Sequence, residues 1–259
     1  MSAHPQRRIA ALAISALTLA LAGCQSSHAS PLVNPSGSAS SAAPSTTPEP
    51  RAALAVLAAE AQDRRETVIY QLTSPGRSAR SVVVTRATDG GWRVDIAQGA
   101  LGGTADVSVA RLSSGLFQCA LASGTRLITP FCVKAAKADG RLRYEYDPQV
   151  QHMFVDWLDP FTDRRAAISV APADKITGAD GDCYSVESNA ASLVPPVDPG
   201  VYCYRADGLL TAASNSLGTL VIVGTPTTAP PTIVLPGTIT DSAPLTMKAP
   251  KPAPNKSDR

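Results

Sequence analysis

Apolar side chains alternate with polar ones along much of this chain, and this period of two is the feature that most limits its fold. Two runs show it best, with apolar side chains on one face at Val68, Tyr70 and Leu72, and at Trp92, Val94 and Ile96. The Asp89-Gly90-Gly91 stretch before the second run is typical of a hairpin turn. Further strands are expected at 81–85, 107–112, 116–121, 127–133, 182–187, 201–205, 209–213 and 217–223, with an extended piece at 232–235. The pattern predicts an antiparallel sheet that opens with a meander of about six strands.

Two segments replace this alternation with the three-and-four spacing of helices. The first, 51–66, is rich in Ala and Leu and carries on one face Leu54, Leu57, Ala58 and Ala61. The second follows Asp147-Pro148 and has at helical spacing Val150, Met153, Phe154 and Trp157. Pro160 is expected to end it, with a further helical turn over 164–167. Together these elements predict an α+β fold, in which a curved antiparallel half-barrel carries helices packed on one face.

The N-terminus has the features of an export signal. Arg7 and Arg8 precede an uncharged stretch of about 14 residues, shorter than the roughly 20 that cross a membrane. It ends in Leu21-Ala22-Gly23-Cys24, which resembles the lipobox of bacterial lipoproteins. The resemblance implies cleavage of residues 1–23, acyl chains on Cys24, and anchoring on the outer face of the cell membrane. An ordinary secretory signal or an uncleaved apolar segment is the alternative.

Composition divides the mature chain into a tether, one domain and a tail. After Cys24, the stretch up to residue 50 is mostly Ser, Pro, Ala and Thr, and 241–259 is similarly poor in bulky apolar residues, so both are expected to be disordered. The segment between them, 51–240, has the length of a single domain. Loss of two arginines with the signal leaves 23 − 2 = 21 basic and 21 acidic side chains, a balance that argues against nucleic acid as a partner.

Four cysteines remain in the domain, and an even count in an exported chain indicates disulfide bonds. They are Cys119, Cys132, Cys183 and Cys203. Four cysteines allow three pairings. We favour Cys119–Cys132 and Cys183–Cys203, because each pair would link consecutive strands. Closing each loop is worth about 3 kcal/mol in the chain-entropy model.

No pattern for catalysis, a metal or a cofactor stands out. The chain lacks Cys-x-x-Cys, a nucleophile elbow and a phosphate-binding glycine loop, and His152 has no Cys or second His near it in the sequence. Asp156, Asp159 and Asp163 have no calcium-loop spacing and are interpreted as solvated charges near the helix end. We therefore expect no catalytic residue, no metal site and no cofactor, and do not expect an enzyme.

A sheet with helices across one face can hold a ligand between the two layers. The candidate walls of such a groove on the sheet are Val68, Tyr70, Leu72, Trp92, Val94 and Ile96. The candidates on the helical side are Met153, Phe154 and Trp157. The alternative interpretation is that all of these side chains form a packed core.

The element order resembles that of the LolA/LolB-like superfamily of periplasmic lipoprotein carriers and the related mycobacterial lipoproteins of the LprG and LppX kind. It runs from an initial helix through a β-meander and a helical insert at 150–167 to strands that end near Ile233-Val-Leu-Pro236. The segments Gly181-Asp-Cys-Tyr184 and Val201-Tyr-Cys-Tyr204 are also similar to those of actinobacterial lipoproteins. The resemblance implies a half-open barrel that binds acyl chains or lipids, although two disulfides would restrict its opening. We therefore expect a membrane-anchored protein that binds a lipid or other hydrophobic ligand in the groove between sheet and helices. The alternative is an envelope sensor or adaptor that binds a protein partner and has no ligand cavity.

Overall fold

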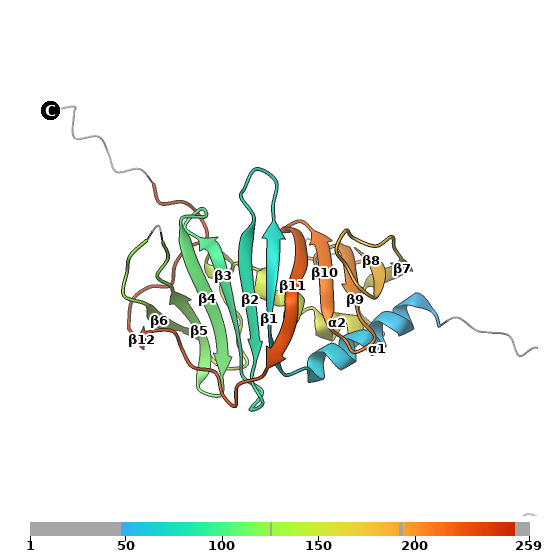
Figure 1. Cartoon of the computed structure of the whole chain (residues 1–259), viewed down its shortest axis with the longest axis horizontal. Coiled ribbons are helices and arrows are strands. Elements are labelled where there is room, and N and C mark those ends of the chain that lie inside the picture. Colours follow the sequence, from blue (N-terminus) through green and yellow to red (C-terminus); the bar gives the residue numbers. More distant parts are fainter. Residues whose placement is uncertain (1–47, 125, 192–193, 252–259) are drawn as a thin grey trace, which may run out of the picture. The chain divides into compact units, whose positions relative to one another are not determined.

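The structure, a computed structural model, describes residues 48–251 except 125 and 192–193 (Figure 1). The expected signal and Cys24 lie outside these residues. The helices are α1 (Pro50–Asp63), η1 (Tyr144–Tyr146), η2 (Val150–Phe154) and α2 (Leu158–Thr162). The strands are β1 (Glu66–Thr73), β2 (Arg80–Arg86), β3 (Trp92–Ala100), β4 (Ala105–Leu112), β5 (Gly115–Ala120), β6 (Phe131–Ala136), β7 (Ile168–Pro172), β8 (Asp182–Ser188), β9 (Gly200–Tyr204), β10 (Leu210–Asn215), β11 (Gly218–Thr228) and β12 (Thr238–Ile239). In the described part of the chain, no helix is long and apolar enough to span a membrane.

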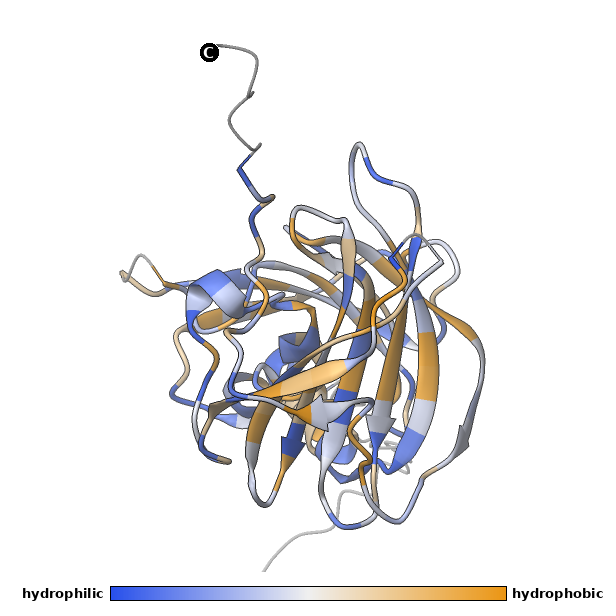
Figure 2. Ribbon diagram, turned by 90° about the vertical axis from the view of Figure 1, so that its left-hand side faces the viewer, coloured by the Kyte–Doolittle hydropathy of each residue, from blue (hydrophilic) through white to orange (hydrophobic). Residues whose placement is uncertain are grey.

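All twelve of these strands belong to one large, open and curved sheet, so the fold is α+β as expected. The strand order is β12-β6-β5-β4-β3-β2-β1-β11-β10-β9-β8-β7. Neighbours are antiparallel throughout, except that β12 runs parallel to β6. In Figure 2 the hydrophobic residues are concentrated along the strands, as the alternation predicted.

Two meanders, β1–β6 and β7–β11, make up most of this sheet and meet where β1 pairs with β11. The pairing runs from Glu66 opposite Thr228 to Thr73 opposite Thr219, with an irregularity between Thr67 and Ile69. Because this contact joins the start of the domain to a strand near its end, it makes one continuous core from two locally folded halves.

Helix α1 begins where Glu49 and Pro50 favour a helix start. The carboxylate of Glu49 accepts hydrogen bonds from the amides of Arg51 (3.2 Å) and Ala52 (3.1 Å), and Pro50 occupies the first turn, where its missing N–H costs no hydrogen bond. The helix buries the expected face, namely Leu54, Leu57, Ala58 and Ala61. It packs against α2 and β7.

The helical insert differs from the single helix expected there. Residues 150–154 form the 3₁₀ helix η2, the chain bends at Val155, and α2 then begins at Leu158. Pro160 is part of α2 rather than its end, because in the first turn of a helix the backbone N–H has no intrahelical partner to lose. The further helical turn expected over 164–167 is also absent, and the chain enters the edge strand β7 instead.

Both expected disulfides, Cys119–Cys132 and Cys183–Cys203, are present. Each joins directly opposite residues of neighbouring strands, β5 with β6 and β8 with β9, at a Cα–Cα distance of 4.0 Å. They lie outside the main core, in small clusters of their own. Leu235 packs on the first pair, and Ile176 is one of the side chains on the second.

The chain after β11 wraps around the β6 edge of the sheet. Ile233 packs with Ala87 and Ala110 in a cluster separate from the main core, β12 then pairs with β6, and Leu245 packs against the main core. The expected disordered tail, 241–259, is therefore corrected: the described part, 241–251, makes specific contacts, and 252–259 lie outside the described residues. Two apolar side chains at alternate positions, Leu245 and Met247, pack against the core. This short pattern is hard to recognise in a segment that is otherwise rich in Pro and Ala.

Candidate functional site

The side chains expected to line a ligand groove are all buried within one hydrophobic core. The least buried of them, Trp157, is 9% exposed, and Leu72, Val94 and Ile96 are fully buried. The others in this core are Val68, Tyr70, Trp92, Met153 and Phe154. The structure brings the sheet residues and the helical residues together, as expected, but it packs them against one another.

Aromatic contacts show how the helical insert fits onto the sheet. The ring centroids of Tyr70 and Phe154 are 5.0 Å apart, and those of Phe161 and Tyr202 are 5.2 Å apart in an edge-on arrangement. The hydroxyl of Tyr70 donates a 2.9 Å hydrogen bond to the carbonyl of Leu210. Contacts of this kind stabilise a close-packed interface rather than an open channel.

A small slot remains between the two layers. Its volume is about 30 Å³, and its lining includes Val68, Tyr70, Met153 and Phe154. This space suits about two water molecules, whereas pockets for drug-sized ligands are of order 300–1,000 Å³. Tyr204 also lines the slot, and its buried hydroxyl has no hydrogen-bond partner among the described residues.

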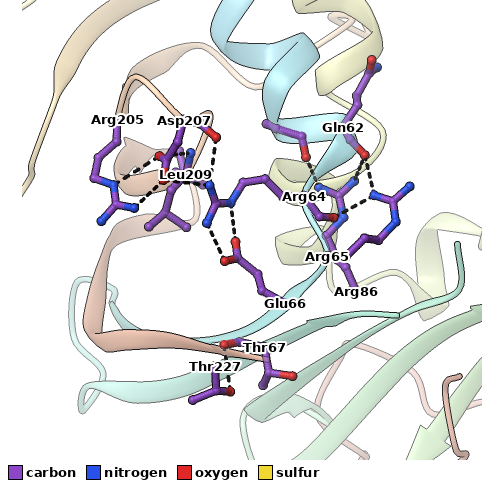
Figure 3. A network of polar contacts seen from close by, with 12 residues as sticks. Gln62, Arg64, Arg65, Glu66, Thr67, Arg86, Arg205, Asp207, Leu209 and Thr227 are labelled. Atoms are coloured by element: carbon purple, nitrogen blue, oxygen red, sulfur yellow. Dashed lines mark hydrogen bonds and ion pairs between the residues drawn. The ribbon is translucent and has the colours of Figure 1, made fainter. Parts of the chain in front are cut away.

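A network of ion pairs lies at this slot (Figure 3). The guanidinium of Arg64 bonds to the Glu66 carboxylate and, at 2.8 Å, to the carbonyl of Asp207. Arg205 also pairs with the Asp207 carboxylate. The hydrogen bond from Arg205, together with Arg64, lowers the pKa of Asp207 well below its usual range, although burial opposes this shift. The Arg64–Glu66 pair thus gives the apolar slot a charged border.

A polar cleft of about 280 Å³ lies beside the C-terminal end of α1. Arg65 and Arg86, which line it, both donate hydrogen bonds to the carbonyl of Gln62, at 2.8 and 3.4 Å. Burial, and to a lesser degree the nearby Arg65, lower the pKa of Arg86 to about 10. Cations at this position satisfy the last carbonyls of a helix and its negative dipole end, so a structural role accounts for both arginines.

His152 is held by carboxylates on both ring nitrogens. Its Nε2 lies 2.8 Å from Asp147 and its Nδ1 lies 2.5 Å from Asp156. Burial alone would lower the pKa of His152, but the hydrogen bonds to Asp147 and Asp156 outweigh it and raise the pKa to about 9. A protonated imidazole with both nitrogens engaged has no free nitrogen with which to accept a proton from a substrate.

The other candidate residues are scattered. Asp159 bonds to Gln62 at 2.8 Å, and Asp163 accepts a hydrogen bond from the amide of Arg165. Within residues 48–251, apart from the three that are not described, no group of three or more His, Cys, Asp or Glu side chains is placed to hold a metal ion.

Two features of the surface and interior were not predicted. Ile69 of β1 and Val223 of β11 are directly paired and about half exposed, on the face of the sheet away from the main core. Gln118 of β5 is 2% exposed, on the core face of its strand, where it binds the segment after β12. The sequence signal for Gln118 is a polar residue at the inward position of an alternating run, between Leu116 and Ala120.

Comparison with known proteins adds no assignment to this site. No protein-family model matches the chain. The search of curated proteins also finds no significant match.

Proposed function

We propose that this chain is a lipid-anchored, extracytoplasmic adaptor, which binds a partner protein of the cell envelope through its surface. In this proposal the signal is removed before Cys24, acyl chains on Cys24 hold the protein at the outer face of the membrane, and residues 25–48 act as a tether. The tether ends two residues earlier than expected, because Glu49 caps α1 and Pro50 begins it. The curved sheet is a half-barrel whose helices cover one face.

The observation that carries the proposal is the filled interior. The side chains that would contact a lipid contact one another instead, and the slot between them is about 30 Å³. A carrier must bury most of its ligand, which requires a pocket about ten times larger. The two cross-strand disulfides support the proposal, because they favour a rigid sheet that presents a fixed surface.

A tether is consistent with a protein that acts through its surface. A flexible chain of 24 residues spans about 25–30 Å on average, which would let the domain reach a partner beyond the lipid headgroups. Replacing Cys24 with Ser is expected to abolish labelling by radioactive palmitate and to release the protein from the membrane fraction. Retained labelling or retained membrane association would contradict the anchor.

Photo-cross-linking in cells tests the adaptor role. A photoreactive residue replaces Val56, Tyr144 or Val223 in turn, because these side chains are exposed on α1, η1 and β11. We expect one position to give a discrete cross-linked product that depends on Cys24, while the others serve as matched controls. The proposal fails if no position gives a product and lipid extracted from the purified protein is present in a one-to-one ratio.

A second candidate function is the binding of a hydrophobic ligand, as in the LolA/LolB-like carriers that the element order resembles. The observation in its favour is that four of the expected groove residues line the slot, next to the Arg64–Glu66 pair. This function requires the helical insert to move away from the sheet, with loss of contacts such as that between Tyr70 and Phe154. Extractable lipid would make it the primary interpretation.

A further inference from the structure

The segment Pro244–Lys248, which we call the strap, is held against the domain by backbone hydrogen bonds on two sides. On one side, the amides of Leu101 and Gly102, between β3 and β4, donate to the carbonyls of Thr246 (2.8 Å) and Met247 (2.9 Å). On the other side, the amide of Met247 donates to the carbonyl of Glu145 in η1 (2.9 Å). Because these hydrogen bonds involve only backbone atoms, any peptide whose backbone follows the same course can form them, whatever its sequence.

The buried side chain of Gln118 also forms hydrogen bonds with the backbone of the strap. Its Nε2 donates to the carbonyl of Leu245 (3.0 Å) and its Oε1 accepts from the amide of Leu245 (2.6 Å). The same Nε2 also donates to the carbonyl of Tyr146, which fixes the orientation of the amide group (2.7 Å). Gln118 is therefore positioned to hold a peptide unit, because its oxygen and the second N–H of its amide are satisfied only when one is present.

Side chains of the strap alternate between the domain and solvent. Leu245 and Met247 are partly buried and pack against the main core, whereas Thr246 and Lys248 are exposed. Two inward positions separated by one residue are what a groove for an extended peptide recognises. We call the wall formed by Leu101, Gly102, Gln118, Glu145 and Tyr146 the strap groove.

The wall of the groove fits closely around its occupant. A side chain at Gly102 would place Cβ 2.7 Å from the Cβ of Ala249, the residue directly after the strap, so only glycine lets the chain lie this close. Leu101 next to it has a φ of 52°, which is uncommon for a residue with a large side chain and persists where surrounding contacts hold it. The hydrogen bond from its amide to Thr246 is one such contact.

The strap does not fill the available space. A cleft of about 420 Å³ lies next to Pro244, and its lining includes Lys134, Arg143, Tyr146 and Ile239. Ile239 is 61% exposed there. A longer or bulkier segment would find additional contacts that the strap itself does not make.

We propose that the strap groove is the site at which this adaptor binds its partner, and that the ligand is an extended protein segment with apolar side chains at alternate positions. The strap occupies the groove in the absence of the partner and is displaced by it. This inference rests on the proposed adaptor function and gives it a site. Five hydrogen bonds to main-chain atoms of the strap favour a peptide over a hydrocarbon tail, which offers no amide or carbonyl to Gln118.

The test uses the full chain and a synthetic peptide with the sequence of residues 242–250. In the variant Leu245→Ser with Met247→Ser, the strap loses its inward side chains, while a matched control carries Thr246→Ser with Lys248→Ser at the exposed positions. We expect the labelled peptide to bind the first variant roughly tenfold or more tightly than it binds the wild-type chain or the control, because a docked strap reduces the fraction of open grooves. Adding Gln118→Ala to the first variant is expected to weaken this binding about tenfold.

Hydrogen exchange at the amides of Leu101 and Gly102 shows whether the groove is open. Fast exchange in the first variant, with no peptide binding, overturns the proposal and makes the strap a structural clasp. Unchanged protection also overturns it, since Leu245 and Met247 would then not hold the strap. Binding of a fluorescent fatty acid in place of the peptide assigns the groove to lipid. A failure here with a discrete cross-linked partner at Val223 would remove this site but leave the adaptor function standing.

Discussion

Gln118 and Leu245 lie 127 residues apart in the chain and form two hydrogen bonds with each other, one in each direction. The amide side chain thus pairs with a backbone unit as a neighbouring strand would. This contact ties the end of the described chain to β5 near the middle of the sequence. It also explains why a glutamine occupies a buried, inward-facing position between apolar neighbours.

Replacing Gln118 with Ala removes both hydrogen bonds and leaves the carbonyl and amide of Leu245 without that partner. We expect the free energy of unfolding to fall by about 1–3 kcal/mol and the amide of Leu245 to exchange faster with solvent. Gln71→Ala, at an exposed position of β1, is the matched control and is expected to change neither. Unaltered exchange at Leu245 in the Gln118 variant would show that the side chain does not hold the strap.

Two substitutions on β1 distinguish a packed core from a ligand groove. Leu72 is fully buried and Ile69 is 48% exposed. Leu72→Ala is expected to cost about 2–5 kcal/mol of stability through the cavity it leaves, whereas Ile69→Ala should stay within about 0.5 kcal/mol. Urea denaturation measures both. If Leu72→Ala were nearly neutral and instead changed the amount of bound lipid, the groove interpretation would replace the packed core.

Protonated His152 is expected to make stability depend on pH. Its pKa rises from 6.5 to about 9 on folding, so its contribution is complete below pH 6.5 and is lost as the pH rises through 9. The rise corresponds to about 3 kcal/mol. Unfolding at pH 6 and pH 9.5 should therefore show a larger loss of stability in the wild-type chain than in His152→Gln. Equal losses in the two chains would mean that the bonds to Asp147 and Asp156 do not stabilise the charged ring.

The two disulfides are expected to stabilise the domain by similar amounts, because they close loops of 13 and 20 residues. Replacing either pair with Ala should cost about 3 kcal/mol each. Differential scanning calorimetry of the two double variants measures this, with the reduced wild-type chain as the reference for loss of both. If a variant melts at the same temperature as the wild type, the disulfide that it lacks does little to restrict the conformations of the unfolded chain.

Local patterns predicted the strands and the disulfide pairs well, because both depend on short-range features. The alternation of Val68, Tyr70 and Leu72 marks β1 directly, and cysteines on consecutive strands can meet without knowledge of the whole fold. The pairing of β1 with β11 could not be predicted in the same way. It joins residues about 150 positions apart, and nothing in either strand specifies the other.

The interior of the domain shows a second limit of prediction from the sequence. Periodicity identified which side chains face inward, including Trp92 and Phe154, but not whether the facing element would fill the space between them. That depends on the volume of each side chain and the path of η2 and α2, which bend where one helix was expected. The strap was missed because two apolar residues, Leu245 and Met247, are too short a pattern to stand out in a Pro- and Ala-rich segment.

Native mass spectrometry of the protein produced in an oxidising compartment, before and after organic extraction, tests the central claim most directly. A filled core predicts the mass of the processed chain with its covalently attached acyl groups and nothing else bound, lower by four hydrogens than that of the fully reduced form because of its two disulfides. Extraction should then leave the mass unchanged. An adduct of lipid mass that extraction removes would contradict the account, since a space of about 30 Å³ cannot hold it.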